Sequence, residues 1–167
     1  MTPDLGASPD SVGPVPEAAN LGIVRPPLVY LGSIALGLVL HFVRPMPLLQ
    51  RGVSPLFGLL VILLAISLFV GAVRSFRTAG TPVPGNQPTT AIVRAGPYRF
   101  SRNPIYLAFS LLQLGIAFSV NSIWLVATLL AAVAVISLVV IPKEERYLER
   151  RFPSEYPPYK ASVRRWL

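Results

Sequence analysis

The sequence predicts an all-α integral membrane protein with about four transmembrane helices, a cytoplasmic cap loop and an interfacial C-terminal helix. Of its 167 residues, 53% are hydrophobic and only 13% are charged, whereas a soluble domain carries about 25% charged residues. Lys, Arg, Asp, Glu and Pro are all absent from three stretches, 28–43, 56–73 and 105–141. This distribution excludes an ordinary soluble globule.

The three apolar stretches set the positions of the helices. The first two are close to the ~20 residues that cross a bilayer. As a single helix the third would be ~55 Å long, against a hydrocarbon core of ~30 Å, so it must fold back. We place that turn at the polar residues 119–122. The predicted membrane helices therefore cover residues 26–43, 55–73, 103–119 and 122–141.

Basic residues predict the orientation in the membrane. Thirteen of the fifteen Lys and Arg residues lie before the first predicted helix, between the second and third, or after the fourth, and only Arg44 and Arg51 lie elsewhere. The positive-inside rule then predicts that the N-terminus, the 74–103 loop and the C-terminus are cytoplasmic. In a prokaryote this would be the inner membrane. The net charge of +8 follows this topology, so we expect the lipid bilayer and not nucleic acid as a partner.

Composition divides the chain into three parts. Residues 1–25 contain four prolines and three acids without an early basic cluster, which predicts a disordered tail and not a cleavable signal peptide. Residues 26–73 form the first two helices. Residues 74–167 form a second unit, with a cap loop, the helical hairpin 103–141 and a C-terminal helix. The 74–103 loop is rich in Pro and Gly but also has apolar residues, which favours a folded cap over a disordered loop.

The segment after the fourth helix is expected to lie on the membrane surface. Pro142 followed by Lys143, Glu144 and Glu145 is typical of a helix start, because acidic residues complement the positive end of the helix dipole. Basic residues then alternate with aromatic ones. This pattern predicts aromatic side chains that face lipid and basic side chains that reach the headgroups; the aromatic residues are Phe152, Tyr156, Tyr159 and Trp166.

Several kinds of chemistry are excluded or disfavoured. The chain has no cysteine and one histidine, so we expect no metal site. It has no nucleotide-binding glycine motif. Both aspartates, Asp4 and Asp10, lie in the predicted tail, which argues against a Ser-His-Asp triad. Gln113, Gly115 and Ser119 lie within the third helix, where such residues usually serve helix packing.

One polar constellation remains. Residues 96–106 lead into the third helix, and Glu144 and Glu145 leave the fourth. Because these helices form a hairpin, both groups should meet at the cytoplasmic end, where Arg and Glu side chains suit a zwitterionic ligand. An alternative assigns Arg99 and Arg102 to topology and the glutamates to the helix dipole.

The segment 96–106, GPYRFSRNPIY, resembles the signature of the isoprenylcysteine carboxyl methyltransferase family and of related membrane phospholipid methyltransferases. The Glu-Glu pair follows after one hairpin, and the tail 152–159 keeps the spacing of its Phe and two Tyr residues. The resemblance covers about residues 74–166. Four positions depart from the pattern: Asn103 replaces histidine, Ala108 and Pro153 replace glycines, and Ser162 stands where relatives often have arginine.

The resemblance implies a membrane methyltransferase that uses S-adenosylmethionine without a Rossmann domain. Arg102 and Glu145 would be the catalytic residues, and either glutamate of the pair is a candidate proton acceptor. The methyl acceptor would be a carboxylate or thiol of an amphiphilic or small molecule. The residues implied to bind the cofactor are Tyr98, Arg102, Asn103, Pro104, Tyr106, Leu107, Glu144 and Glu145.

Two other functions compete with this one. Membrane sterol reductases look similar in their C-terminal helices and use NADPH, which gives a reductase as one alternative. The other alternative is a non-enzymatic four-helix membrane protein, although a scaffold role does not explain the arginine-rich loop. The identity of the acceptor and the oligomeric state stay open.

Overall fold

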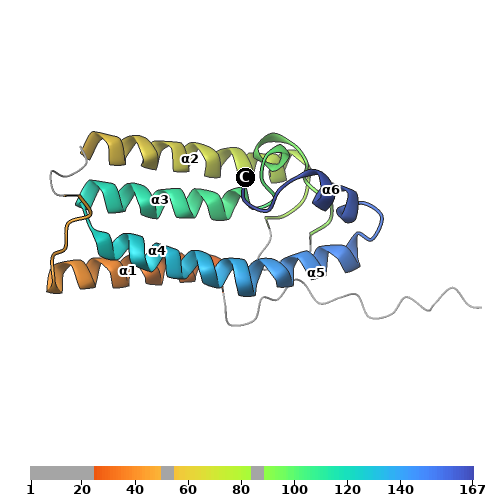
Figure 1. The fold of residues 1–167 in the computed structure, drawn as a ribbon. Coiled ribbons are helices and arrows are strands. Elements are labelled where there is room, and N and C mark those ends of the chain that lie inside the picture. The colour runs from red at the N-terminus through yellow and green to blue at the C-terminus, as the bar shows by residue number, and fades with distance from the viewer. Residues whose placement is uncertain (1–24, 50–54, 84–88) are drawn as a thin grey trace, which may run out of the picture.

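The computed structural model describes residues 25–49, 55–83 and 89–167, and these residues are helical with no strand among them (Figure 1). The all-α prediction is therefore confirmed, while the predicted tail lies, except for Arg25, outside the described residues. The elements are α1 (Pro26–Val43), α2 (Pro55–Thr78), a 3₁₀ turn η1 (Gly96–Arg99), α3 (Pro104–Val120), α4 (Ile123–Val135), a π-helical turn η2 (Ile136–Val140), α5 (Ile141–Arg151) and α6 (Tyr156–Ser162).

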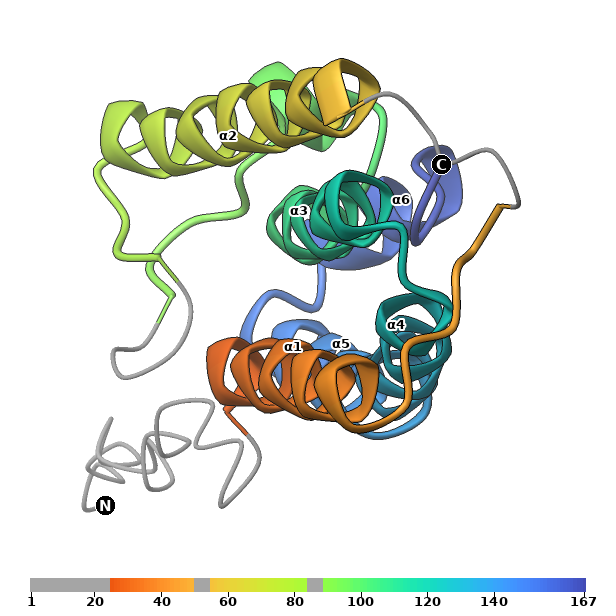
Figure 2. The ribbon, with the colours of Figure 1, turned by 90° about the vertical axis from the view of Figure 1, so that its left-hand side faces the viewer.

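The four apolar helices form an up-and-down bundle. Viewed along its axis, α3 lies between α2 and the α1–α4 pair (Figure 2), and the main packing partners are α2 with α3 and α1 with α4. Helices α1, α2 and the continuous Ile123–Arg151 helix are long and apolar enough to cross a membrane, and α3 is a shorter apolar helix. Leu, Val, Ile and Phe side chains cover the outer faces of α1 and α2, as a lipid-facing surface requires.

Small residues allow α2 and α3 to pack closely, as the sequence predicted for Gly115 and Ser119. A Cβ atom on Gly58 of α2 would clash with Ser119 and would lie 2.8 Å from the carbonyl oxygen of Gly115. A Cβ atom on Gly115 would lie 2.7 Å from the Cγ1 atom of Ile62. Contact of this kind is the usual basis of helix association in lipid, where no hydrophobic effect drives helices together.

The α3–α4 turn falls within the predicted residues 119–122. Asn121 adopts the left-handed conformation with φ of 54°, and the backbone N–H of Ser122 donates to the carbonyl of Ala117, which is a Schellman ending. The Asn121 side chain also accepts hydrogen bonds from the backbone N–H groups of Leu48 and Leu49. One residue thus ends α3 and fixes the α1–α2 connection against it.

Two helix ends differ from the prediction. Helix α2 continues beyond residue 73 to Thr78, because Phe76 and its neighbour Ser75 are buried against the following loop. Pro142 does not start a new helix, since α4, η2 and α5 form one continuous helix. In η2 the N–H of Ile141 bonds the carbonyl of Ile136, five residues back. This wider turn directly precedes a proline that has no N–H to donate.

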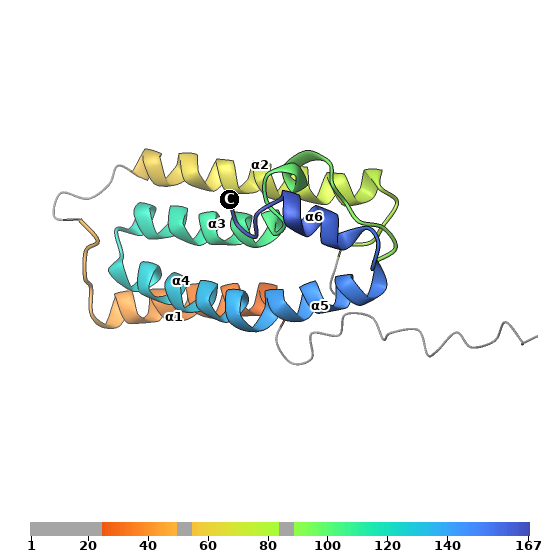
Figure 3. The ribbon, with the colours of Figure 1, turned by 45° about the vertical axis from the view of Figure 1, so that its right-hand side comes forward.

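The C-terminal segment folds back onto the bundle. After α5 the chain reverses, and α6 lies over the start of α3 and the loop before it (Figure 3). Tyr156 and Tyr159 are only 2% and 5% exposed, so the prediction that they face lipid was wrong. A hydrogen bond explains the burial of Tyr159, because its hydroxyl donates to the backbone carbonyl of Tyr98 over 2.8 Å. A phenol that faced lipid could not make this bond.

Candidate functional site

Residues 89–103 of the loop before α3 are folded, as the cap interpretation predicted. Gly96 has φ of 58°, and a Cβ atom there would lie 2.5 Å from the Ser75 hydroxyl, so the position needs glycine on both counts. The following η1 turn places the Tyr98 ring edge-on to Phe76 of α2, with 5.1 Å between centroids. Tyr98, Phe76, Ala72 and Val93 form one buried cluster. Packing on α2 therefore holds the part of the loop that contains Val93 and Tyr98.

Residues 101–103 connect this loop to the C-terminal segment. The backbone N–H of Arg102 donates to the carbonyl of Arg164, and the Asn103 amide donates to the carbonyl of Arg165, each over 2.9 Å. The Ser101 hydroxyl accepts the Asn103 N–H and donates to the same Arg165 carbonyl. The chain after α6 is thereby held against the three residues that precede α3.

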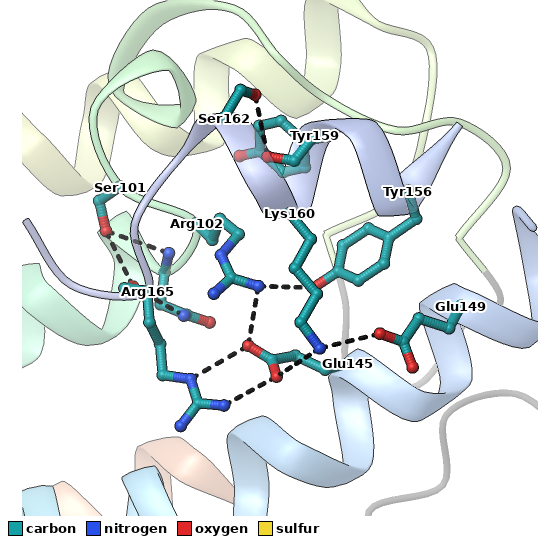
Figure 4. A network of polar contacts seen from close by, with 10 residues as sticks. Ser101, Arg102, Glu145, Glu149, Tyr156, Tyr159, Lys160, Ser162 and Arg165 are labelled. Carbon is teal, nitrogen blue, oxygen red and sulfur yellow. Dashed lines mark hydrogen bonds and ion pairs between the residues drawn. The ribbon is translucent and has the colours of Figure 1, made fainter. Parts of the chain in front are cut away.

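Glu145 is the centre of an ion-pair network (Figure 4). Its Oε1 atom lies 3.0 Å from an Arg102 nitrogen, and Arg165 donates to both carboxylate oxygens, over 3.1 Å and 2.8 Å. Lys160 lies 3.5 Å from Oε2 and 2.8 Å from Glu149. The network joins the loop before α3, helix α5, helix α6 and the last residues of the chain.

The side chains of this network differ in their exposure to solvent. The Arg102 and Glu145 side chains are 10% and 8% exposed, whereas those of Lys160 and Arg165 are each 38% exposed. The hydrogen bond to Glu149 raises the pKa of Lys160, and the hydrogen bond to Glu145 raises that of Arg165. Lys160 and Arg165 therefore stay charged at neutral pH. Together with Arg102 they surround the carboxylate of Glu145, and Lys160 also pairs with Glu149.

Glu144 makes a separate contact. Its Oε1 atom accepts a hydrogen bond of 2.5 Å from the Tyr106 hydroxyl, and among the described residues no cation lies within ion-pair distance of it. Tyr106 is in the first turn of α3, two residues after the buried Pro104. Leu107 belongs to the same turn, is half-buried, and donates its backbone N–H to the carbonyl of Asn103.

The tyrosines of this region serve as neutral donors and packing surfaces. Burial raises the pKa of Tyr98, and it raises the pKa of Tyr159 to about 12, so both phenols stay protonated. Arg94 lies 5.8 Å from the Tyr159 ring centroid and donates to the backbone carbonyl of Glu155. These contacts fasten the cap loop to α6.

Two polar groups of the region have no partner within the described residues. The Nε atom of Arg102 and the hydroxyl of Tyr147 are buried and make no hydrogen bond. An unsatisfied buried donor costs about 1–3 kcal/mol. Such groups are therefore candidates for contact with a bound molecule.

The structure brings the predicted residues to one end of the bundle, in three separate contacts. It pairs Arg102 with Glu145, Tyr106 with Glu144, and Tyr98 with Tyr159. The sequence prediction missed Lys160 and Arg165, which it assigned to the headgroup region. The available signal was the Glu-Glu pair, because a buried carboxylate needs cations and the basic residues after α5 are one source of them.

Comparison with known proteins identifies the family of the chain. The family model of phospholipid methyltransferases matches residues 53–155, from the start of α2 through α5, and confirms the resemblance drawn from the sequence. No match was found among curated proteins or among solved structures. The matched range is more than half of the chain and contains the signature before α3 as well as the Glu-Glu pair. The chain belongs to the phospholipid methyltransferase family and is a membrane methyltransferase.

Proposed function

We propose that the chain transfers a methyl group from S-adenosylmethionine to a carboxylate or thiol of an amphiphilic or small acceptor. The observation that carries this proposal is the buried guanidinium of Arg102, which keeps a free Nε–H although Glu145 pairs its other end. A carboxylate is the natural partner of such a group. The Glu144 carboxylate, which among the described residues is held by a phenol and by no cation, provides the complementary place for positive charge.

The residues present fit the proposed cofactor. S-adenosylmethionine has a carboxylate, an ammonium and a sulfonium group; when bound it would supply a methyl group on positively charged sulfur. Arg102 would hold the carboxylate, and Glu144 would lie near positive charge, whose burial a carboxylate makes less costly. The remaining residues proposed to bind the cofactor are Tyr98, Asn103, Pro104, Tyr106, Leu107 and Glu145.

The side chains of the chain itself have distinct roles in this proposal. Glu145 and Arg165 hold the Arg102 guanidinium in one orientation, because the carboxylate bridges the two arginines. The Tyr106 phenol fixes one oxygen of Glu144. Where the acceptor is not already anionic, Glu144 or Glu145 would accept its proton. Holding both reactants in line supplies much of the rate in a displacement reaction.

The proposed acceptor would arrive through the membrane. An amphiphile would enter between helices with its headgroup at the level of the cap loop. We further propose that the site faces the cytoplasm, in line with the distribution of basic residues, and that in a prokaryote it lies on the inner membrane. The cofactor would then come from the aqueous side.

Calorimetric titration of the purified protein in detergent tests the proposal. S-adenosylmethionine and S-adenosylhomocysteine should bind saturably, NADPH should not, and Arg102→Ala should weaken binding by at least tenfold. Lys143→Gln is the matched control, since Lys143 is exposed beside Glu144 on the same helix. Binding of NADPH alone would establish the reductase alternative. Folded protein that binds none of these ligands would refute the proposed function.

A further inference from the structure

Helix α1 lies outside the residues matched by the family model, yet it reaches the first turn of α3. The hydroxyl of Tyr30 lies 3.2 Å from the backbone carbonyl oxygen of Tyr106 and 2.8 Å from the Oγ atom of Ser110. The Ser110 hydroxyl itself donates to the Tyr106 carbonyl over 2.9 Å. The three oxygens lie within hydrogen-bond distance of one another, and the two hydroxyl protons are shared among these contacts.

The same tyrosine is packed as well as hydrogen-bonded. Tyr30 is 2% exposed and belongs to one hydrophobic cluster with Tyr106 and with Ile136, Val140 and Ile141 of the η2 region. Its ring centroid lies 5.4 Å from that of Phe109. Tyr30 therefore bonds the helix that carries Tyr106 and shares a buried cluster with the helix that leads to Glu144.

We propose that Tyr30 is a positioning residue for the Tyr106–Glu144 pair, so that α1 is part of the catalytic unit and more than a membrane anchor. The proposal rests on the proposed function of that pair. Tyr30 acts through Tyr106: its hydroxyl fixes the backbone from which the Tyr106 phenol reaches Glu144. A side chain held from two directions keeps a narrower range of orientations, and binding then requires less ordering.

The chain offers a matched control for Tyr30 on the same helix. Ser33 lies one turn further along α1, and its hydroxyl donates to the Gln113 side chain of α3 over 2.6 Å. Gln113 is fully buried and donates in turn to Thr128 and to the carbonyl of Leu125 on α4. Ser33→Ala therefore removes an α1–α3 hydrogen bond that does not involve Tyr106.

The first experiment measures S-adenosylhomocysteine affinity for wild-type protein and for Tyr30→Phe, Ser33→Ala, Tyr106→Phe and the Tyr30→Phe/Tyr106→Phe double variant. Tyr30→Phe keeps the ring and should weaken binding roughly two- to tenfold, the range of one lost hydrogen bond. Ser33→Ala should leave affinity within about twofold of wild type. In the Tyr106→Phe background the Tyr30→Phe effect should vanish. Equal effects of Tyr30→Phe and Ser33→Ala, or full additivity in the double variant, would overturn the proposal.

A second experiment needs no ligand. The infrared carboxyl band of Glu144, identified by its loss in Glu144→Gln, reports the hydrogen bond from Tyr106. Tyr30→Phe should shift this band and Ser33→Ala should not. If wild-type protein binds no S-adenosylhomocysteine, the proposed function fails, and the band shift alone decides the role of Tyr30. An unshifted band in folded Tyr30→Phe protein would refute that role.

Discussion

Replacing Glu145 by Gln should destabilise the protein far more than the same replacement of Glu149. Glu145 bridges Arg102 and Arg165, and its side chain is 8% exposed. Removing one member of a buried ion pair leaves an uncompensated charge, at a cost of about 3–5 kcal/mol. Glu149 lies one turn further along α5, is 39% exposed and pairs only with Lys160 among the described residues. An exposed pair of this kind contributes about 0–1 kcal/mol.

Thermal unfolding in detergent without ligand measures the difference. For a chain of this size the Glu145→Gln loss corresponds to a fall of roughly 6–20 °C in Tm, and Glu149→Gln should change Tm by less than about 4 °C. Adding Arg102→Met to Glu145→Gln removes the uncompensated guanidinium and should recover part of the loss. Equal shifts for the two Glu→Gln variants, or a further loss on adding Arg102→Met, would show that burial of the network is not what makes it costly to break.

Two further predictions concern packing and alkaline stability. Gly58→Ala should lower Tm markedly, because its Cβ atom would clash with Ser119. Gly32 has open space around it, so Gly32→Ala should leave Tm unchanged or slightly raised. Equal Tm values for the two variants would contradict the α2–α3 contact. Burial raises the pKa of Tyr159 to about 12, above the ordinary 10, so the unfolded chain loses this proton first and stability should fall between pH 10 and 12. Tyr159→Phe should flatten that fall in urea unfolding measured across this pH range, and an unchanged slope would refute the assignment.

The sequence alone predicts most of the fold, because stretches without charged residues and proline mark the helices that cross the membrane. The predicted starts of α1 and α2 agree with the structure, and the α3–α4 turn was placed correctly from polar residues that include Asn121. The uninterrupted helix through Pro142 was not predicted. A proline before acidic residues fits a helix start equally well, and what decides between the two is the packing of Ile136, Val140 and Ile141 in the core.

The sequence could predict only the part of the candidate site that the α3–α4 hairpin brings together. The hairpin between α3 and α4 brings the 96–106 segment and the Glu-Glu pair to one end, and that much follows from topology. The partners of Glu145 do not follow from it, because Lys160 and Arg165 reach the carboxylate only through the chain reversal before α6. Basic residues between aromatic ones describe a membrane-surface helix just as well, so the local pattern could not distinguish the two arrangements.

The length of the uninterrupted Ile123–Arg151 helix determines how deep the site lies in the bilayer. Its 29 residues extend ~44 Å, against a hydrocarbon core of ~30 Å, so about nine residues stand outside the hydrocarbon. If the hydrocarbon begins at Ile123, Glu144 and Glu145 lie on this protruding part, at the level of the headgroups. A thicker bilayer would draw both carboxylates toward the acyl chains, whereas in a thinner bilayer the helix would tilt or protrude further. Lipid acyl-chain length thereby becomes a physical control on the site.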